Sequence, residues 1–242
     1  SENPEVVYWV GCAASYEKQQ IARAVVKILN AAKVTYKILG PEEWCSGAPL
    51  ARMGYQEMVR KELMPHNLDA VARTGTKALV TACAECYRSF ARDYKDWGGN
   101  PPFSVFHISH FLEKLVREKR ITFTKPIPQS VVFHDACHMG RVCDTFDPPR
   151  QALKFIKDLK LLEILPMREE ALCSGGGGGF PDVYPAQAAN VASRRIEAAV
   201  NTGSNTIVTT CPHAEMHFDK IAKQRNMQIS IVDLAEMVAQ AL

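Results

Sequence analysis

Cysteines recur at a fixed interval in the two halves of this 242-residue chain. Cys45 and Cys83 are separated by 38 positions, and so are Cys173 and Cys211. A duplicated fold repeats its apolar residues because they pack, but packing does not require a thiol at the same place in both copies. The interval therefore predicts two copies of one unit, with cysteines that converge as ligands on one point in each copy.

The residues around these cysteines repeat as well. Positions 44–47 read Trp-Cys-Ser-Gly and positions 172–175 read Leu-Cys-Ser-Gly. Each half also begins with an apolar run that ends on a cysteine, Cys12 in the first half and Cys137 in the second. Three cysteines per half thus fall at matching places, which extends the predicted duplication over most of the chain.

Short apolar runs alternate with amphipathic segments along both halves. Strands are predicted at 6–11, 34–39, 78–82, 105–108, 131–134, 161–165, 206–210 and 229–232. Helices are predicted at 15–32, 55–73, from Cys86 toward Tyr94, and at 109–119, 149–159, 185–202, 212–224 and 234–242. This alternation predicts an α/β fold of two pseudo-repeated Rossmann-like units with mostly parallel sheets.

The predicted division follows the repeat. The first unit covers 1–120, a linker with Pro126 and Pro128 covers 121–129, and the second unit covers 130–242. Parallel α/β sheets bind ligands beyond the carboxyl ends of their strands. We expect the cysteine sites at such ends, because four cysteines fall at the carboxyl ends of predicted strands: Cys12, Cys83, Cys137 and Cys211.

Composition limits the class of protein. A content of 47% hydrophobic and 23% charged residues is typical of a globular protein, and a net charge of +3 argues against a nucleic-acid partner. No apolar stretch approaches the roughly 18 residues that span a bilayer, so no direct membrane span is expected. The first residues carry no targeting pattern. We expect a cytoplasmic protein, free or attached to a membrane complex through a partner, in which eight cysteines favour metal or redox chemistry over disulfides.

The first predicted site holds four cysteines: Cys12, Cys45, Cys83 and Cys86. The Cys-x-x-Cys pair at a predicted helix start can chelate one metal ion or one edge of a cluster, and the helix N-terminus favours the thiolate form. Four thiolates complete the shell of a [4Fe–4S] cluster or of a tetrahedral zinc ion. Thiols alone do not choose between iron and zinc.

The second predicted site holds Cys137, Cys173 and Cys211, and Ala214 stands where the first half has Cys86. Structural metal sites are closed, whereas reactive sites keep one position open for substrate. A cluster with an exchangeable iron, a catalytic metal and a degenerate copy kept for packing all remain open here. The candidates for a fourth ligand are Cys143, His134, His138 and His213.

After Cys173 and Ser174, an unbroken run of five glycines occupies positions 175–179. Gly175, Gly176 and Gly177 let the backbone approach a bulky cofactor and present N–H groups to anionic sulfur. A nucleotide-binding loop is disfavoured, since no Gly-Lys-Ser/Thr follows and Phe180-Pro181 argues against a helix starting there.

These motifs resemble the cysteine-rich "CCG" family, which includes the B and D subunits of heterodisulfide reductase and related iron–sulfur oxidoreductases. The resemblance runs from position 6 to about 222. It also includes Gly11 before Cys12, positions 134–141 (His-Asp-Ala-Cys-His-Met-Gly-Arg) with Pro149 and Arg150 beyond, and positions 173–177 (Cys-Ser-Gly-Gly-Gly). The family's Cys-Cys-Gly motif reads Cys-Ser-Gly here, because Ser46 and Ser174 stand at the second thiol position.

The resemblance implies an iron–sulfur subunit of a heterodisulfide-reductase-like complex, with one [4Fe–4S] cluster at the first site and a second centre at the other. It implies electron transfer to or from a thiol, a disulfide or sulfur on a carrier, as in sulfur metabolism. Electrons are expected from partner subunits of an iron–sulfur/flavin complex, since the chain lacks a ferredoxin-like cysteine motif. His134, His138 and Arg141 are the candidates for proton delivery or anion contact at the second site.

Two other functions remain open. In one, the chain is a non-catalytic scaffold whose thiol sites hold zinc or stay vacant and which docks a partner oxidoreductase. In the other, Cys83 and Cys86 act as a metal-free dithiol. The second does not account for the repeated 38-residue interval.

Overall fold

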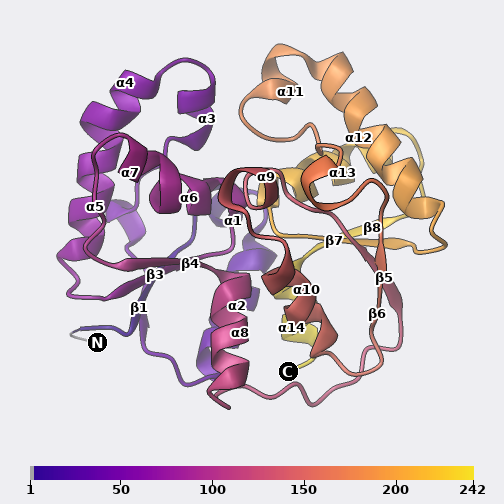
Figure 1. Cartoon of the computed structure of the whole chain (residues 1–242), viewed down its shortest axis with the longest axis horizontal. Coiled ribbons are helices and arrows are strands. Elements are labelled where there is room, and N and C mark those ends of the chain that lie inside the picture. Colours follow the sequence, from indigo (N-terminus) through magenta and orange to yellow (C-terminus); the bar gives the residue numbers. More distant parts are fainter. Residues whose placement is uncertain (1–2) are drawn as a thin grey trace.

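The computed structural model describes residues 3–242 and contains two four-stranded parallel sheets (Figure 1). The order in the first sheet is β2-β1-β3-β4, and in the second it is β6-β5-β7-β8. The strands are β1 (Val6–Trp9), β2 (Tyr36–Lys37), β3 (Ala78–Thr81), β4 (Ser104–His107), β5 (Ser130–Phe133), β6 (Lys160–Glu163), β7 (Thr206–Thr209) and β8 (Ser230–Asp233). The strand orders match position for position, so the fold is α/β with two repeated sheets, as predicted.

Helices connect the strands of each sheet. The first half contains α1 (Cys12–Tyr16), α2 (Gln19–Ala31), η1 (Gly40–Glu42), α3 (Ala48–Arg52), α4 (Gln56–Met58), η2 (Val59–Leu63), α5 (Met64–Ala72), α6 (Ala84–Arg88), η3 (Ser89–Asp93), α7 (Tyr94–Asp96) and α8 (Ile108–Arg117). The second half contains α9 (Gly140–Cys143), α10 (Asp147–Lys154), η4 (Arg168–Glu170), α11 (Phe180–Val183), α12 (Pro185–Val200), α13 (Pro212–Gln224) and α14 (Leu234–Gln240).

Most predicted elements are present, and the differences from the prediction are local. The strand predicted at 34–39 is reduced to β2, and the two helices predicted over 55–73 and toward Tyr94 each contain a π-helical turn, η2 and η3. Short helices that the sequence did not predict follow several cysteines. The prediction that no helix starts at Phe180-Pro181 is wrong: α11 begins there, because the first turn of a helix tolerates proline.

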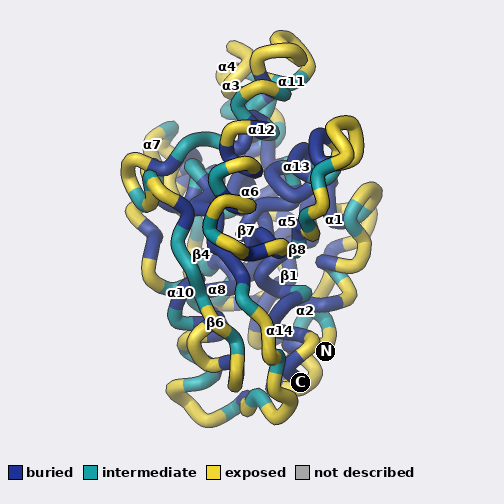
Figure 2. Tube along the Cα trace, turned by 90° about the vertical axis from the view of Figure 1, so that its right-hand side faces the viewer, coloured by how far each residue is buried: buried dark blue, intermediate teal, exposed yellow. Residues whose placement is uncertain are grey.

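The two sheets share a buried cluster of residues from both halves, which is part of the dark interior of Figure 2. Helix α2 of the first half packs on α14 of the second, and α10 of the second half packs on α8 of the first. Since α2 corresponds to α10 and α8 corresponds to α14 in the repeat, the two contacts are reciprocal. This is the relation that a twofold axis generates. The domain bounds at 121–129 stay a prediction.

The cysteine-bearing strand ends face the boundary between the halves. Helices α6, α9 and α13 begin soon after β3, β5 and β7, and they gather there in Figure 1. Within residues 3–242, no helix combines the length and the apolar character that crossing a bilayer requires.

Candidate metal centre

Cys12 and Cys45 form a thiol–thiolate pair in the first half. Cys12 opens α1 directly after Gly11, whose φ of +78° turns the chain out of β1. The hydrogen bond from Cys12 lowers the pKa of Cys45 to about 6, and the Gly47 N–H, 3.3 Å from the Cys45 sulfur, and the charge of His213 lower it further. The same bond raises the pKa of Cys12 far above its usual range. Of the two thiols, Cys45 is therefore the one whose ionisation the surroundings favour.

Cys137 and Cys173 repeat this pair in the second half. The hydrogen bond from Cys137 lowers the pKa of Cys173 to about 6, helped by the Gly175 N–H at 3.3 Å from its sulfur and by the charge of Arg141. The bond holds the pKa of Cys137 far above its usual range. In both repeats, the thiol with the lowered pKa is thus the one at the Cys-Ser-Gly turn.

A third pair joins the two halves. Cys83 caps α6 and Cys211 stands at the N-cap position of α13, and the two thiols are hydrogen-bonded to each other. That bond holds the pKa of Cys211 well below its usual range and, together with a bond to Cys86, raises that of Cys83. Cys86 donates its backbone N–H to the Cys83 sulfur at 3.5 Å. The sequence predicted one point of convergence per repeat, whereas the structure brings the two sets into contact.

Steric constraints explain why both Cys-Ser-Gly turns end in glycine. Gly47 and Gly175 have φ of +75° and +74°, a region that side chains other than glycine rarely adopt. A Cβ atom at Gly47 would collide with Val59, and one at Gly175 would lie 2.7 Å from the carbonyl oxygen of Ala188. Each turn can therefore hold its cysteine at the site only with glycine two positions on.

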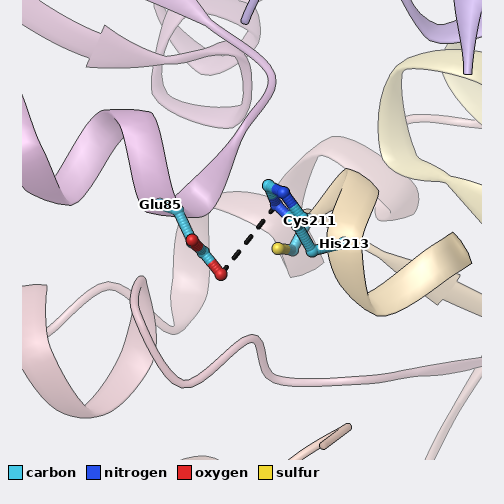
Figure 3. A group of neighbouring side chains, drawn as sticks. All are labelled: Glu85, Cys211 and His213. Atoms are coloured by element: carbon cyan, nitrogen blue, oxygen red, sulfur yellow. Dashed lines mark ion pairs between the residues drawn. The ribbon is translucent and has the colours of Figure 1, made fainter. Parts of the chain in front are cut away.

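Glu85 and His213 face each other beside Cys211 (Figure 3). Each lies two residues after the third cysteine of its repeat. Burial lowers the pKa of His213, but its hydrogen bond to Cys211 and the charge of Glu85 outweigh burial and raise that pKa to about 10. Burial also raises the pKa of Glu85 to about 7.

The three residues predicted to move protons or contact anions have different surroundings in the structure. His134 is buried against Arg195 and Phe218, and burial lowers its pKa to about 3. Burial lowers the pKa of His138 to about 4, with Cys211 and His213 among the charges that act on it. Arg141 donates a hydrogen bond to the carbonyl of Ala171, and its positive charge acts to lower the pKa of both Cys137 and Cys173. Their functional roles stay predictions.

The glycine run packs its backbone against the first half. Gly178 donates its N–H to Glu85 Oε1 at 3.2 Å, and a Cβ atom at Gly177 would collide with that same oxygen. A cavity of about 430 Å³ opens beside the run, between α3 and α11. Its lining residues are Arg52, Met53, Tyr55, Gly178, Gly179, Phe180, Val183 and Tyr184.

A second cavity, of about 290 Å³, reaches the Cys12–Cys45 pair. Trp44, Glu43 and Tyr16 also line it. Glu43 accepts the backbone N–H groups of Val10 and Gly11 and so braces the loop that carries Cys12. Burial raises the pKa of Glu43 to about 7.

Sequence reasoning missed Glu85. The repeat could have revealed it, because Glu85 and His213 occupy equivalent positions in the first turns of α6 and α13 and both are polar. Cys143, weighed as a fourth ligand, lies near Tyr87 and Thr145, and its role as a ligand stays a prediction; burial raises its pKa to about 11.

The donor set fits an iron–sulfur cluster or a soft metal ion. All eight cysteines are free thiols, and those of the three pairs lie at or next to helix starts or glycine turns that direct N–H groups at sulfur. A Cβ atom at Gly11 would lie 3.3 Å from the Cys86 sulfur, so the backbone leaves room there that any side chain would fill.

Comparison with known proteins agrees with this chemistry. The family model of the cysteine-rich domain (CCG) matches residues 6–91 and 131–219. The chain is 34% identical over its full length to the D subunit of the dihydromethanophenazine:CoB–CoM heterodisulfide reductase of Methanosarcina acetivorans, and it covers 60% of that protein. It is 32% identical to the probable iron-sulfur-binding oxidoreductase FadF of Bacillus subtilis over 98% of its own length and 34% of the relative.

A third relative is the EtfAB:quinone oxidoreductase of Syntrophomonas wolfei, with 29% identity over 98% of this chain and 34% of that protein. The chain thus spans about 60% or less of the length of these three relatives. Among solved structures, glutamate racemase RacE1 of Bacillus anthracis aligns with a TM-score of 0.41 and 13% identity, covering 99% of this chain and 80% of the racemase. A likeness at that level carries no information about function.

Proposed function

The chain belongs to the cysteine-rich CCG domain family, and on that premise we propose that it is the iron–sulfur subunit of a heterodisulfide-reductase-like complex. Relatives are named as a heterodisulfide reductase subunit and as a probable iron–sulfur-binding oxidoreductase, which supports iron–sulfur electron transfer as the general activity proposed for the chain. The finer proposal is that it passes electrons to or from a thiol, a disulfide or sulfur on a carrier protein.

The observation that carries the proposal is the contact between the two cysteine sets. Cys12, Cys45, Cys83 and Cys86 would hold the principal cluster, a [4Fe–4S] centre, which supplies one-electron transfer when bound. Cys137, Cys173 and Cys211 would form the second centre. Because Cys83 and Cys211 are hydrogen-bonded, an electron at the first set is one contact away from the second.

The residues around the thiols have supporting roles. The N–H groups of Gly47, Gly175 and Cys86 donate to sulfur and stabilise the thiolate charge that a cluster needs in its ligands. Arg141 adds a positive charge beside Cys137 and Cys173. The 430 Å³ cavity beside the glycine run is large enough for a small thiol or for the tip of a carrier segment, so it is the proposed substrate entrance.

Anaerobic purification with iron analysis and electron paramagnetic resonance tests the proposal. We expect about four iron atoms per chain and a reduced-cluster signal, as one [4Fe–4S] centre gives. Cys45→Ala should remove both, whereas Cys143→Ala should keep both, because Cys143 belongs to neither set. Iron below one atom per reconstituted wild-type chain would sink the proposal.

The alternative function, a non-catalytic scaffold, predicts that a complex with its partner keeps its activity when a cysteine of the first set is removed. If the thiol sites only hold zinc or stay vacant, a reconstituted complex containing Cys45→Ala should keep its full thiol/disulfide turnover. Loss of that turnover with an intact complex on size-exclusion chromatography supports the electron-transfer subunit instead.

A further inference from the structure

A cluster of acidic side chains lies where the first half meets α13 and α14. Lys18 of the first half pairs with Glu215, at 2.8 Å, and with Asp219, both on α13. Glu236 on α14 accepts the N–H of Asp233 at 3.2 Å, and Asp233 caps that helix. Among the described residues, Lys18 is the only cation in an ion pair with any of these four acids. The excess of acids over paired cations favours the binding of protons here.

The carboxyl groups are close enough to share a proton. The side chains of Glu215 and Glu236 are hydrogen-bonded to each other, which requires a proton on one of them. Burial raises the pKa of Glu215 to about 7, and burial also raises the pKa of Glu236. Burial and the charge of Glu215 hold the pKa of Asp233 well above its usual range. The surroundings therefore favour the protonated form of Asp233.

Asp233 also has an oxygen atom that is left unsatisfied. Its Oδ1 accepts the N–H of Ala235 at 2.8 Å, whereas its Oδ2 has no hydrogen-bond partner within residues 3–242. The hydroxyl groups of Thr209 and Tyr8 likewise have no partner in the described part of the chain, and both side chains are fully buried. Thr209 on β7 is the register partner of Asp233, so the two side chains leave the sheet on the same face.

These hydroxyl groups lead from Asp233 toward the cysteines. Thr209 stands two residues before Cys211, and in the first half the equivalent Thr81 accepts the N–H of Cys83 at 3.2 Å. The charges of Asp233 and Cys83 both act on Tyr8, which places its hydroxyl group between the acids and the first cysteine set. A hydroxyl group both donates and accepts hydrogen bonds, so it can pass a proton onward.

The outer end of the cluster reaches the surface. A groove of about 310 Å³ lies between α2 and α14, and its lining includes Arg23, Lys27 and Glu236. Glu236 is half-buried, whereas Asp233 is fully buried. Glu236 therefore connects the solvent in the groove with the buried acid that it contacts.

We propose that Glu236 and Asp233 carry protons between this groove and the cysteine sets. The path deepens the proposed function and rests on it for the reaction that consumes the protons. Reduction of a disulfide breaks the S–S bond, takes up two electrons and two protons, and leaves two thiols. The electrons come from the partner subunits, and the protons come from Asp233, which Glu236 reloads from the groove. A substrate in the cavity of about 430 Å³ displaces water there, so the protons need this second route.

Infrared spectroscopy of the purified chain tests the path without any cluster. We expect a carbonyl band of a protonated carboxylic acid, which Asp233→Asn should weaken. After rapid mixing into D₂O, this band should shift more slowly in Glu236→Gln by about tenfold or more, the scale of one lost hydrogen bond to a charged group. Glutamine keeps the capping box, and partial unfolding would speed the exchange rather than slow it. Glu197→Gln, on an exposed face of α12, should exchange like the wild type.

Turnover of the reconstituted iron-loaded complex, with oxidised glutathione as the disulfide, tests the role in the reaction. Glu236→Gln should lower the rate by about 100-fold, as loss of a positioned proton donor does. Formate is small and anionic, which suits a groove lined by Arg23 and Lys27, and it should restore the rate of Glu236→Gln but not that of Asp233→Asn. An active wild type with an equally active Glu236→Gln overturns the proposal, and so does equal infrared exchange in these two proteins. An inactive wild type counts against the proposed function alone, and the infrared exchange then decides whether the path exists.

Discussion

At the scale of single residues, one arginine holds the loop that carries Cys137. Arg150 is 4% exposed and bonds the carboxylates of Asp135, at 2.7 and 2.9 Å, and Glu163, at 2.7 and 2.8 Å. It also stacks over the ring of Phe133, 5.0 Å from the ring centroid. The guanidinium therefore ties the segment after β5 to β6 and fixes where Cys137 emerges.

Removing this arginine should be costly. Arg150→Met leaves Asp135 without its buried cation, and breaking such a pair costs about 3–5 kcal/mol. Urea unfolding followed by circular dichroism measures the change. The matched control is Arg60→Met, since Arg60 pairs with Glu57 on an exposed helix face, where such pairs contribute about 0.3–0.5 kcal/mol. Equal losses in the two variants would contradict this account.

At the scale of elements, equivalent helices are capped by unlike residues. His107 caps α8, where its Nδ1 accepts the Ser109 N–H at 3.2 Å, and Asp233 caps α14, where it accepts the Ala235 N–H at 2.8 Å. The opposite nitrogen of His107 lies 3.2 Å from the Thr210 carbonyl, just before Cys211. Burial lowers the pKa of His107 to about 3, so the neutral ring donates from Nε2 and accepts at Nδ1.

The two bonds of His107 can be separated by substitution. His107→Ala removes both the cap and the bond to Thr210, whereas His107→Asn restores only a cap. We expect the asparagine variant to be more stable than the alanine variant by about 0.5–2 kcal/mol in urea unfolding. The same two substitutions at His217, inside α13, should favour alanine, because asparagine is the poorer helix former. No advantage of asparagine at position 107 would refute the capping role.

At the scale of the whole molecule, the halves are not independent bodies. The largest buried cluster contains Tyr8 and Phe111 of the first half together with Phe133 and Leu234 of the second. Helices α2 and α14 pack on each other, as do α8 and α10. Unfolding one half would expose the apolar surface of the other, so the two should lose structure together.

Truncation of a shared core residue tests this cooperativity. Phe111→Ala should lower the free energy of unfolding by about 3–5 kcal/mol, as large core deletions do. The near-ultraviolet and far-ultraviolet circular dichroism transitions should shift together. Phe180→Ala, which removes a ring that is 37% exposed, is the control and should change stability far less. Two separate transitions in the Phe111 variant would show that the halves unfold independently.

The sequence pattern within each segment predicted the strands and helices, which depend mainly on neighbouring residues. The apolar runs indicated the eight strands in order, and α13 begins at Pro212 and ends at Gln224 as predicted. The contact between Cys83 and Cys211 depends on how the two sheets face each other, which no segment encodes alone. Glu85 was missed for the same reason, since its partners lie 126 and 128 positions away in the sequence.

The near-twofold arrangement has a consequence for how such a site can arise. Two identical chains related by symmetry would place the same residue on both sides of their common axis, so a glutamate would meet a glutamate or a histidine a histidine. Fusion of the copies into one polypeptide lifts that restriction. An acid and an imidazole can then oppose each other at the equivalent positions Glu85 and His213, which a homodimer of a single repeat would have to fill with the same residue.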